Sequence, residues 1–125
     1  VMAPLIVSGN TTVIMASEQF PHVAISLAEV LHASDLPGGV VNLLTGDVAE
    51  LLPIAAGHMD VNGLLDGRKA SKEGAALRQE AQVAAAENVK RWLDWDHDWA
   101  ADEAASPYHI LEGQEVQTTW HPIGI

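Results

Sequence analysis

Residues that could bind a cation gather in one short run, Asp94-Trp95-Asp96-His97-Asp98-Trp99. Carboxylates and an imidazole are ligands for zinc or for harder cations. However, no second histidine follows His97 at the i+4 spacing, and helical neighbours one or two positions apart point away from each other. We therefore expect a solvated acidic turn here and no metal site.

No motif for nucleophilic catalysis or phosphate binding is complete. The 125 residues contain no cysteine, which excludes disulfides, thiolate metal ligands and a cysteine nucleophile among them. Ser8 lacks the G-x-S-x-G pattern of a hydrolase nucleophile. Gly63 and Gly67 precede Arg68-Lys69-Ala70-Ser71, but a phosphate loop needs four residues between its glycines and a Gly-Lys-Ser/Thr end. We expect packing or surface roles for the scattered histidines, which are His22, His32, His58, His97, His109 and His121.

The charge balance argues against two classes of partner. Seventeen acids face six bases, the net charge is −11, and residues 1–67 contain acids but no Lys or Arg. Nucleic acids and anionic membranes both require clustered bases, so we expect neither as a partner. No apolar run approaches the roughly 18 residues that cross a bilayer. We expect one soluble domain in the cytoplasm.

The elements that must position these residues alternate between strands and helices. Residues 11–15 and 40–44 are β-branched or apolar runs that predict strands, and 61–65 is a weaker third strand. A helix is predicted from Pro21, since Ala24, Leu27, Ala28 and Leu31 share one face, and a shorter one over 48–56 is closed by Gly57. This order favours an α/β fold with a parallel sheet of about three strands covered by helices.

The second half has a different pattern. Residues 69–92 are rich in Ala, Glu, Gln and Lys and predict the longest helix. Its apolar stripe comprises Leu77, Ala81, Ala84, Ala85, Val89 and Trp92. The acidic run then leads into an ordered surface loop anchored by its tryptophans. The tail, Val116–Trp120, alternates apolar with polar residues and predicts a terminal strand.

Residues 3–21, APLIVSGNTTVIMASEQFP, resemble the segment A-P-A-L-A-A-G-N-T-V-V-L-K-P-S-E-x-x-P of aldehyde dehydrogenases. LAEVL at 27–31, LPGGVVNLLTG at 36–46 and HMDV at 58–61 are similar to the family's following segments in order and spacing. The resemblance implies a partial Rossmann-like parallel sheet with flanking helices. Residues 1–67 would be the remnant of an NAD-binding domain.

The end of the chain resembles the same family. AAENVKR at 85–91 and TWHPIG at 119–124 are similar to the closing segments of some aldehyde dehydrogenase-like bacterial chains. Those segments belong to the assembly region. The resemblance therefore implies that residues 68–125 form a long helix, an acidic Trp-rich loop and an oligomerisation-type tail within the same compact domain. The family's catalytic domain, with its cysteine nucleophile, has no counterpart between Gly67 and Ala85.

The resemblance also implies an eroded cofactor site. In the family, the Lys of K-P-S-E and the Glu three positions later hold the ribose hydroxyls of NAD. Here Met15 replaces that Lys, and Glu18 remains as the single candidate cofactor-binding residue. A thioether is only a weak acceptor. Asp66 would place a carboxylate near the pyrophosphate, which Arg68 could offset. We expect no catalytic residue and no bound cofactor.

Three interpretations follow. In the first, the chain is a non-catalytic aldehyde dehydrogenase-like module that assembles with itself or with a full-length aldehyde dehydrogenase, its tail extending a neighbour's sheet. In the second, it is a fragment of an active NAD-dependent enzyme that oxidises aldehydes to acids, and its nucleophile lies in residues outside this sequence. In the third, it is an unrelated soluble α/β binding module.

Overall fold

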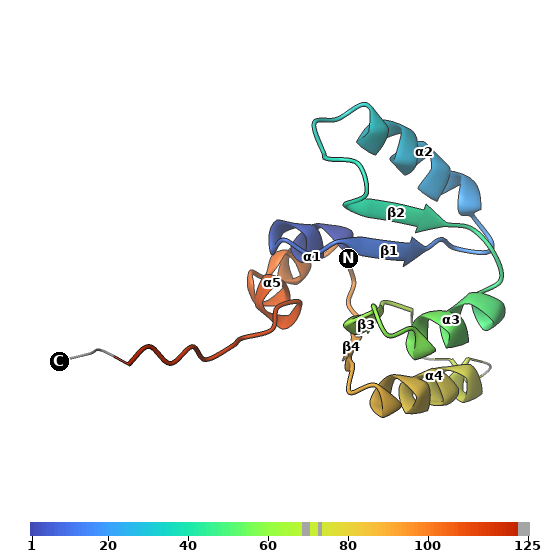
Figure 1. Cartoon of the computed structure of the whole chain (residues 1–125). Coiled ribbons are helices and arrows are strands. Elements are labelled where there is room, and N and C mark those ends of the chain that lie inside the picture. The colour runs from blue at the N-terminus through green and yellow to red at the C-terminus, as the bar shows by residue number, and fades with distance from the viewer. Residues whose placement is uncertain (69–70, 73, 123–125) are drawn as a thin grey trace.

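The computed structural model describes residues 1–68, 71–72 and 74–122. The helices are α1 (Met2–Val7), α2 (Pro21–His32), α3 (Val48–Gly57), α4 (Ala75–Glu87) and α5 (Tyr108–Glu112), with a 3-10 turn, η1 (Asp102–Ala105). The strands are β1 (Thr12–Met15), β2 (Val41–Leu44), β3 (Gly63–Asp66) and β4 (Arg91–Asp94). Figure 1 shows their arrangement.

The strands form two parallel pairs, each joined by a helix that crosses over between its strands. β1 pairs with β2 from Thr12↔Val41 to Met15↔Leu44, and α2 connects them. β3 pairs with β4, and α4 lies between them in the chain. This confirms the expected α/β fold with parallel strands. Among the described residues, the expected single sheet of about three strands is instead two two-stranded sheets, because β3 pairs with β4, whose first two residues fell within the helix predicted over 69–92.

The first four predicted elements form close to their predicted positions because each has strong local signals. β1 is a β-branched run whose Thr12 is buried. Pro21 occupies the first turn of α2, where its missing N–H costs no hydrogen bond. Asp47 caps α3, its side chain accepting a hydrogen bond from the Ala49 N–H at 2.7 Å.

The main hydrophobic core lies where α3 and α4 pack side by side (Figure 1). Leu52, Ala56 and Ala81 are buried there, and the two alanines are fully enclosed. Small side chains at this contact let the two helices approach closely. Met15 of β1 and Trp92 of β4 pack against the same cluster, so the core joins both strand pairs.

The longest helix is shorter than predicted. Among the described residues it begins at Ala75 and ends at Glu87, whereas residues 69–70 and 73 of the predicted span lie outside the described residues. After it, the Val89 N–H bonds the Ala86 carbonyl and the Lys90 N–H bonds the Ala85 carbonyl, both at 3.0 Å. This is the closing pattern of a Schellman motif, with Val89 at φ 56°. The turn redirects the chain, so Trp92 lies on β4 and the predicted helical stripe stops at Ala85.

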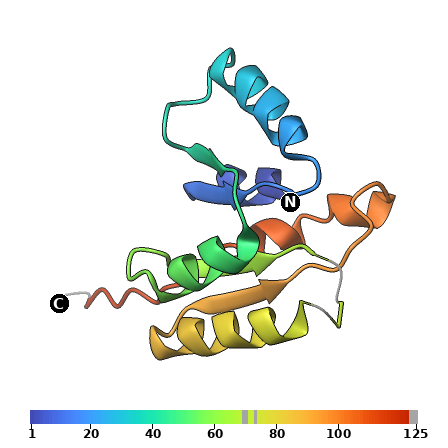
Figure 2. The same ribbon diagram turned by 90° about the vertical axis from the view of Figure 1, so that its right-hand side faces the viewer.

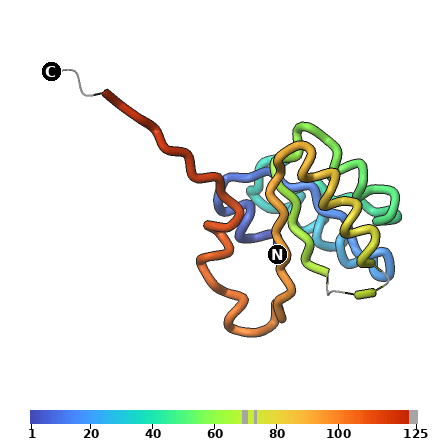
Figure 3. The backbone as a smooth tube through the Cα atoms, turned by 90° about the horizontal axis from the view of Figure 1, so that it is seen from below, coloured from blue at the N-terminus to red at the C-terminus, as the bar shows by residue number. Residues whose placement is uncertain are grey.

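The predicted terminal strand is not present. Residues 114–122 carry no assigned strand and extend away from the body of the molecule (Figures 1 and 3). Val116 is 81% exposed and Trp120 is 85% exposed. A strand needs a neighbour for its backbone hydrogen bonds, and the described part of the chain places none beside the tail.

The two ends of the described fold meet through two short helices that the sequence analysis did not predict. α1 packs against α5, and the Asn10 side chain donates a hydrogen bond to the Gly113 carbonyl at 3.0 Å. Within the described residues, no helix combines the length and apolar character needed to cross a membrane.

Candidate functional site

The candidate cofactor residues from the sequence lie at the carboxyl ends of the parallel strands. Glu18 follows β1 and Arg68 follows β3, while Asp47, which the sequence analysis did not single out, follows β2. In open parallel α/β sheets, ligands bind beyond these strand ends. This edge is therefore the place to test for a dinucleotide site.

Glu18 is exposed, but its carboxylate is already engaged. Its Oε1 accepts a hydrogen bond from the Val48 N–H at 2.6 Å, at the N-terminus of α3. Asp47 accepts from the next N–H, that of Ala49. A helix N-terminus attracts anions because its first N–H groups are unpaired and its dipole is positive there. At the N-terminus of α3, two of these N–H groups already donate to the carboxylates of Glu18 and Asp47, so fewer donors are available there to a phosphate.

Met15 serves the core. It is partly buried and packs against the cluster of Leu52, Ala56 and Ala81. Its thioether has no proton to donate to a sugar hydroxyl. The residue that stands in place of the family's ribose-binding Lys therefore contributes to packing between β1 and α3.

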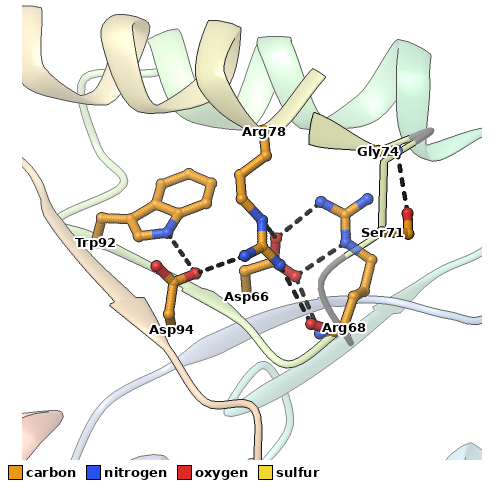
Figure 4. Close-up of polar contacts among 7 residues, drawn as sticks. All are labelled: Asp66, Arg68, Ser71, Gly74, Arg78, Trp92 and Asp94. Carbon is orange, nitrogen blue, oxygen red and sulfur yellow. Dashed lines mark hydrogen bonds and ion pairs between the residues drawn. The ribbon is translucent and has the colours of Figure 1, made fainter. Parts of the chain in front are cut away.

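The most polar part of this edge is an ion-pair network around Asp66, the last residue of β3 (Figure 4). The Asp66 side chain is 6% exposed. Arg68 forms a two-pronged contact with it, from Nε to Oδ1 at 2.9 Å and from Nη2 to Oδ2 at 2.8 Å. Arg78 of α4 adds an ion pair from Nε to Oδ2 at 3.1 Å. One buried carboxylate thus binds two guanidinium groups.

The network continues across α4 to the end of β4. Arg78 Nη1 lies 3.4 Å from Asp94 Oδ1, and the Trp92 indole N–H donates to the same oxygen at 2.9 Å (Figure 4). Arg78 Nη2 also donates to the Arg68 carbonyl at 3.2 Å. The two arginines and two aspartates balance in charge. The network fastens α4 to the ends of both strands that it connects.

The electrostatics follow from this geometry. Burial raises the pKa of Asp66, but hydrogen bonds from Arg68 and the charges of Arg68 and Arg78 outweigh it, so the pKa is lowered from 3.8. The pKa of Arg68 is raised, chiefly by its hydrogen bonds to Asp66 despite partial burial, with smaller contributions from the charges of Asp66 and Glu18. Arg68 therefore lies within the field of two acids, and much of its charge is already compensated.

Sequence reasoning found Asp66 and Arg68 but missed Arg78. The available signal was that Arg78 is the single base within α4. Of the acidic run, Asp94 joins the network.

No group of three or more His, Asp or Glu side chains among the described residues is arranged to hold a metal ion.

A second cluster holds the loop between β4 and α5, as its tryptophans predicted. Trp95 is 2% exposed, and its indole N–H donates to Glu112 Oε2 at 2.6 Å. The ring of His109 lies 5.0 Å from that of Trp95 and 4.9 Å from that of His97, measured between centroids. Trp99 packs against the same His109 ring at 5.6 Å. The loop is thus anchored by aromatic and imidazole rings that pack against one another at tilted angles.

Parallel strand pairs with crossover helices, and candidate residues at their carboxyl ends, define a partial Rossmann-like α/β fragment. Residues 1–65 match the aldehyde dehydrogenase family. The chain belongs to this family. The third interpretation, an unrelated module, is therefore wrong.

The relatives are enzymes much longer than this chain. The chain is 36% identical over 89 residues to a betaine aldehyde dehydrogenase of Rhizobium leguminosarum bv. trifolii (strain WSM2304), a match covering 70% of this chain and 17% of the relative. It is 35% identical over 86 residues to a 1-pyrroline-5-carboxylate dehydrogenase of Staphylococcus aureus (strain JH1), covering 65% and 16%. The match thus spans about a sixth of each relative's length. No solved structure matches the chain.

The similarity reaches beyond the family match at residues 1–65. Because 70% of 125 residues is at least 87 residues, a continuous stretch of that length must contain residues 39–87. That stretch includes all of α3, β3 and α4. The helix that carries Arg78 is therefore part of the similarity to the betaine aldehyde dehydrogenase.

Proposed function

We propose that this chain is a non-catalytic aldehyde dehydrogenase-like module that acts in assembly, with itself or with a full-length aldehyde dehydrogenase. In this proposal residues 1–67 are a remnant of an NAD-binding domain, and residues 68–125 carry the assembly function within the same domain. Its setting would be the cytoplasm. The observation that carries the proposal is the exposed tail, with Val116 and Trp120 more than four-fifths in solvent.

An exposed, extended tail has a clear physical use. Its backbone donors and acceptors are available to add a strand to the edge of a neighbour's sheet. Burying one tryptophan removes about 200 Å² from water and contributes a few kcal/mol, which is enough to decide between monomer and oligomer. Val116, Thr118 and Trp120 alternate along the chain, so an added strand would present all three on one face.

The strand-end chemistry supports a non-catalytic role for this chain. Aldehyde oxidation in this family requires a thiol that adds to the carbonyl, and these 125 residues contain no cysteine. Met15 packs in the core, the Glu18 carboxylate caps α3, and Arg68 is paired with Asp66. The groups that would hold a dinucleotide are committed to the chain's own structure.

The test is removal of the tail. Deleting residues 115–125 should convert a dimer or larger assembly into monomer or aggregate, measured by light scattering at tens of micromolar. The double variant Val116→Ser/Trp120→Ser should act in the same direction. Met59→Ser is the matched control, because Met59 is 84% exposed on another part of the surface. A full chain that is monomeric, with a truncated form equally soluble and stable, would show that the tail has no assembly role.

The alternative is that these residues are a fragment of an active NAD-dependent aldehyde dehydrogenase. The observation that favours it is the length of the relatives, since the match spans about a sixth of them. Intact mass spectrometry of the native polypeptide separates the two proposals. A native polypeptide several hundred residues longer than this sequence, and so much heavier than 13.3 kDa, supports the alternative. A mass near 13.3 kDa supports the assembly module.

A further inference from the structure

Where α5 passes into the tail, three consecutive carbonyl groups accept hydrogen bonds from side chains of distant parts of the chain. Arg91, the first residue of β4, donates from Nη1 to the Glu112 carbonyl at 3.4 Å and to the Gln114 carbonyl. Asn10 donates from Nδ2 to the Gly113 carbonyl between them at 3.0 Å. The last carbonyl groups of a helix have no partner within it, and a basic side chain nearby can bind them.

Packing holds these three residues, the root of the tail, from two further sides. A Cβ atom added at Gly113 would lie 2.8 Å from Leu5 Cδ2, so α1 lies directly against the root. The Glu112 carboxylate accepts a hydrogen bond from the Trp95 indole N–H at 2.6 Å. The root of the tail is therefore attached to α1, to β4 and to the loop that follows β4.

Beyond its root, the tail is free of the rest of the fold. Residues 115–122 are all exposed and carry no helix or strand. Figures 1 and 2 show, in two views at right angles, that the far end of the tail lies outside the body of the molecule. A segment that starts from a fixed root leaves the domain in a restricted range of directions, which lowers its conformational entropy before it meets a partner.

We propose that Arg91 is a positioning residue that sets the direction in which the tail leaves the domain. Its guanidinium binds the carbonyl groups on both sides of Gly113 and so fixes the backbone there. A terminal guanidinium nitrogen carries two N–H groups in a fixed plane, so it can serve two acceptors. The consequence for assembly rests on the proposed function, because a tail that already points in its bound direction loses less entropy on joining a second copy.

Double electron–electron resonance between two spin labels measures this direction. The chain contains no cysteine, so Glu115→Cys, just beyond the root, and Gln79→Cys, on the exposed side of α4, can be labelled specifically. The full chain also carries Val116→Ser/Trp120→Ser, so that docking on a partner does not order the tail. We expect a narrow distance distribution. Arg91→Ala should roughly double its width, and Arg91→Lys, which keeps a charged donor, should restore most of the narrowness.

Lys90→Ala is the matched control. It removes the same charge from the neighbouring position, but Lys90 donates to the carbonyl of His58 at the end of α3 and not to the tail. It should leave the distribution unchanged, and circular dichroism should show equal helix content in all variants. The proposal is overturned if Arg91→Ala gives the distribution of the parent, or if Lys90→Ala broadens it as much.

Sedimentation of the chain with its natural tail tests the consequence for assembly separately. Arg91→Ala should weaken self-association about tenfold, although it changes no residue of the exposed tail, and Arg91→Lys should restore most of the affinity. If the natural chain is monomeric and Arg91→Ala still broadens the distribution, the positioning of the tail stands and the assembly function fails. If Arg91→Ala self-associates as tightly as the parent, the role of Arg91 in assembly is overturned and the assembly function stands.

Discussion

Asp66 is the residue on which the strand-end network depends. Its carboxylate is nearly removed from water and remains charged because two guanidinium groups bind it. Removing one member of a buried ion pair lowers the free energy of unfolding by more than the intact pair contributes to it, because the remaining charge is left buried without a partner. Here the loss would leave Arg68 and Arg78 close together with Asp94 as the remaining acid of the network.

We predict that Asp66→Asn lowers the free energy of unfolding by about 2 kcal/mol at neutral pH. The pKa of Asp66 is lowered in the folded state, so its stabilisation is present above its ordinary value of 3.8 and is lost as pH falls through the folded pKa. The variant should therefore lose less stability on acidification than the parent, measured by urea unfolding between pH 7 and pH 3. Asp60→Asn, at a side chain 94% exposed, is the control and should change stability little. Parallel pH curves for parent and Asp66→Asn would contradict the prediction.

At the scale of elements, the turn that ends α4 places a β-branched residue in a backbone conformation that favours glycine. Val89 occupies the left-handed position of the helix-closing motif, at φ 56°, and is 90% exposed. Glycine is the usual residue there, because a β-branched side chain crowds its own backbone in this conformation. The exposed side chain gains almost nothing from packing to offset this cost.

Val89→Gly should raise the free energy of unfolding by about 1 kcal/mol, since relief of the left-handed strain exceeds the added entropy of the unfolded chain. Val83→Gly, inside α4 at 57% exposure, should lower it by about 0.5 kcal/mol. Chemical denaturation of the two variants should therefore give changes of opposite sign. A loss of stability in both would mean that Val89 does not occupy the left-handed region in solution.

The loop between β4 and α5 depends on one buried indole. Trp95→Ala should lower the free energy of unfolding by about 3 kcal/mol, because it removes a large side chain that packs against Trp99 and His109 and bonds Glu112. Trp120→Ala, at 85% exposure, should change the stability of the monomer by less than about 0.5 kcal/mol. Thermal unfolding followed by far-UV circular dichroism measures both. Equal effects of the two substitutions would refute the anchoring role of Trp95.

At the scale of the whole molecule, the side chains at the strand ends interact with the chain itself and leave few groups to bind a dinucleotide. We predict that the isolated chain binds NAD with a dissociation constant weaker than millimolar, or about 4 kcal/mol or less of binding free energy. The physical reason is that Met15, Glu18 and Arg68 are engaged within the chain. Isothermal titration calorimetry with NAD measures this directly. A micromolar site would instead favour the active-enzyme proposal.

The sequence by itself determined the elements that have strong local signals. β1, α2, β2 and α3 follow from β-branched or apolar runs, a proline in a first helical turn and the glycine that closes a helix. The same local patterns, in order, carried the resemblance to the aldehyde dehydrogenase family, to which the chain belongs. Glu18 was also found from its position in that pattern, since it lies close in sequence to β1.

Tertiary structure decided what depends on contacts between distant residues. Trp92 fits an apolar stripe on a helix or a strand equally well, and only pairing with β3 settles that it lies on β4. Arg78 reaches Asp66 across twelve sequence positions, and Trp95 reaches Glu112 across seventeen, distances that no local periodicity reports. The alternation in Val116–Trp120 is compatible with a strand, but a strand forms only where a neighbouring backbone supplies hydrogen bonds, and the described fold supplies none to the tail.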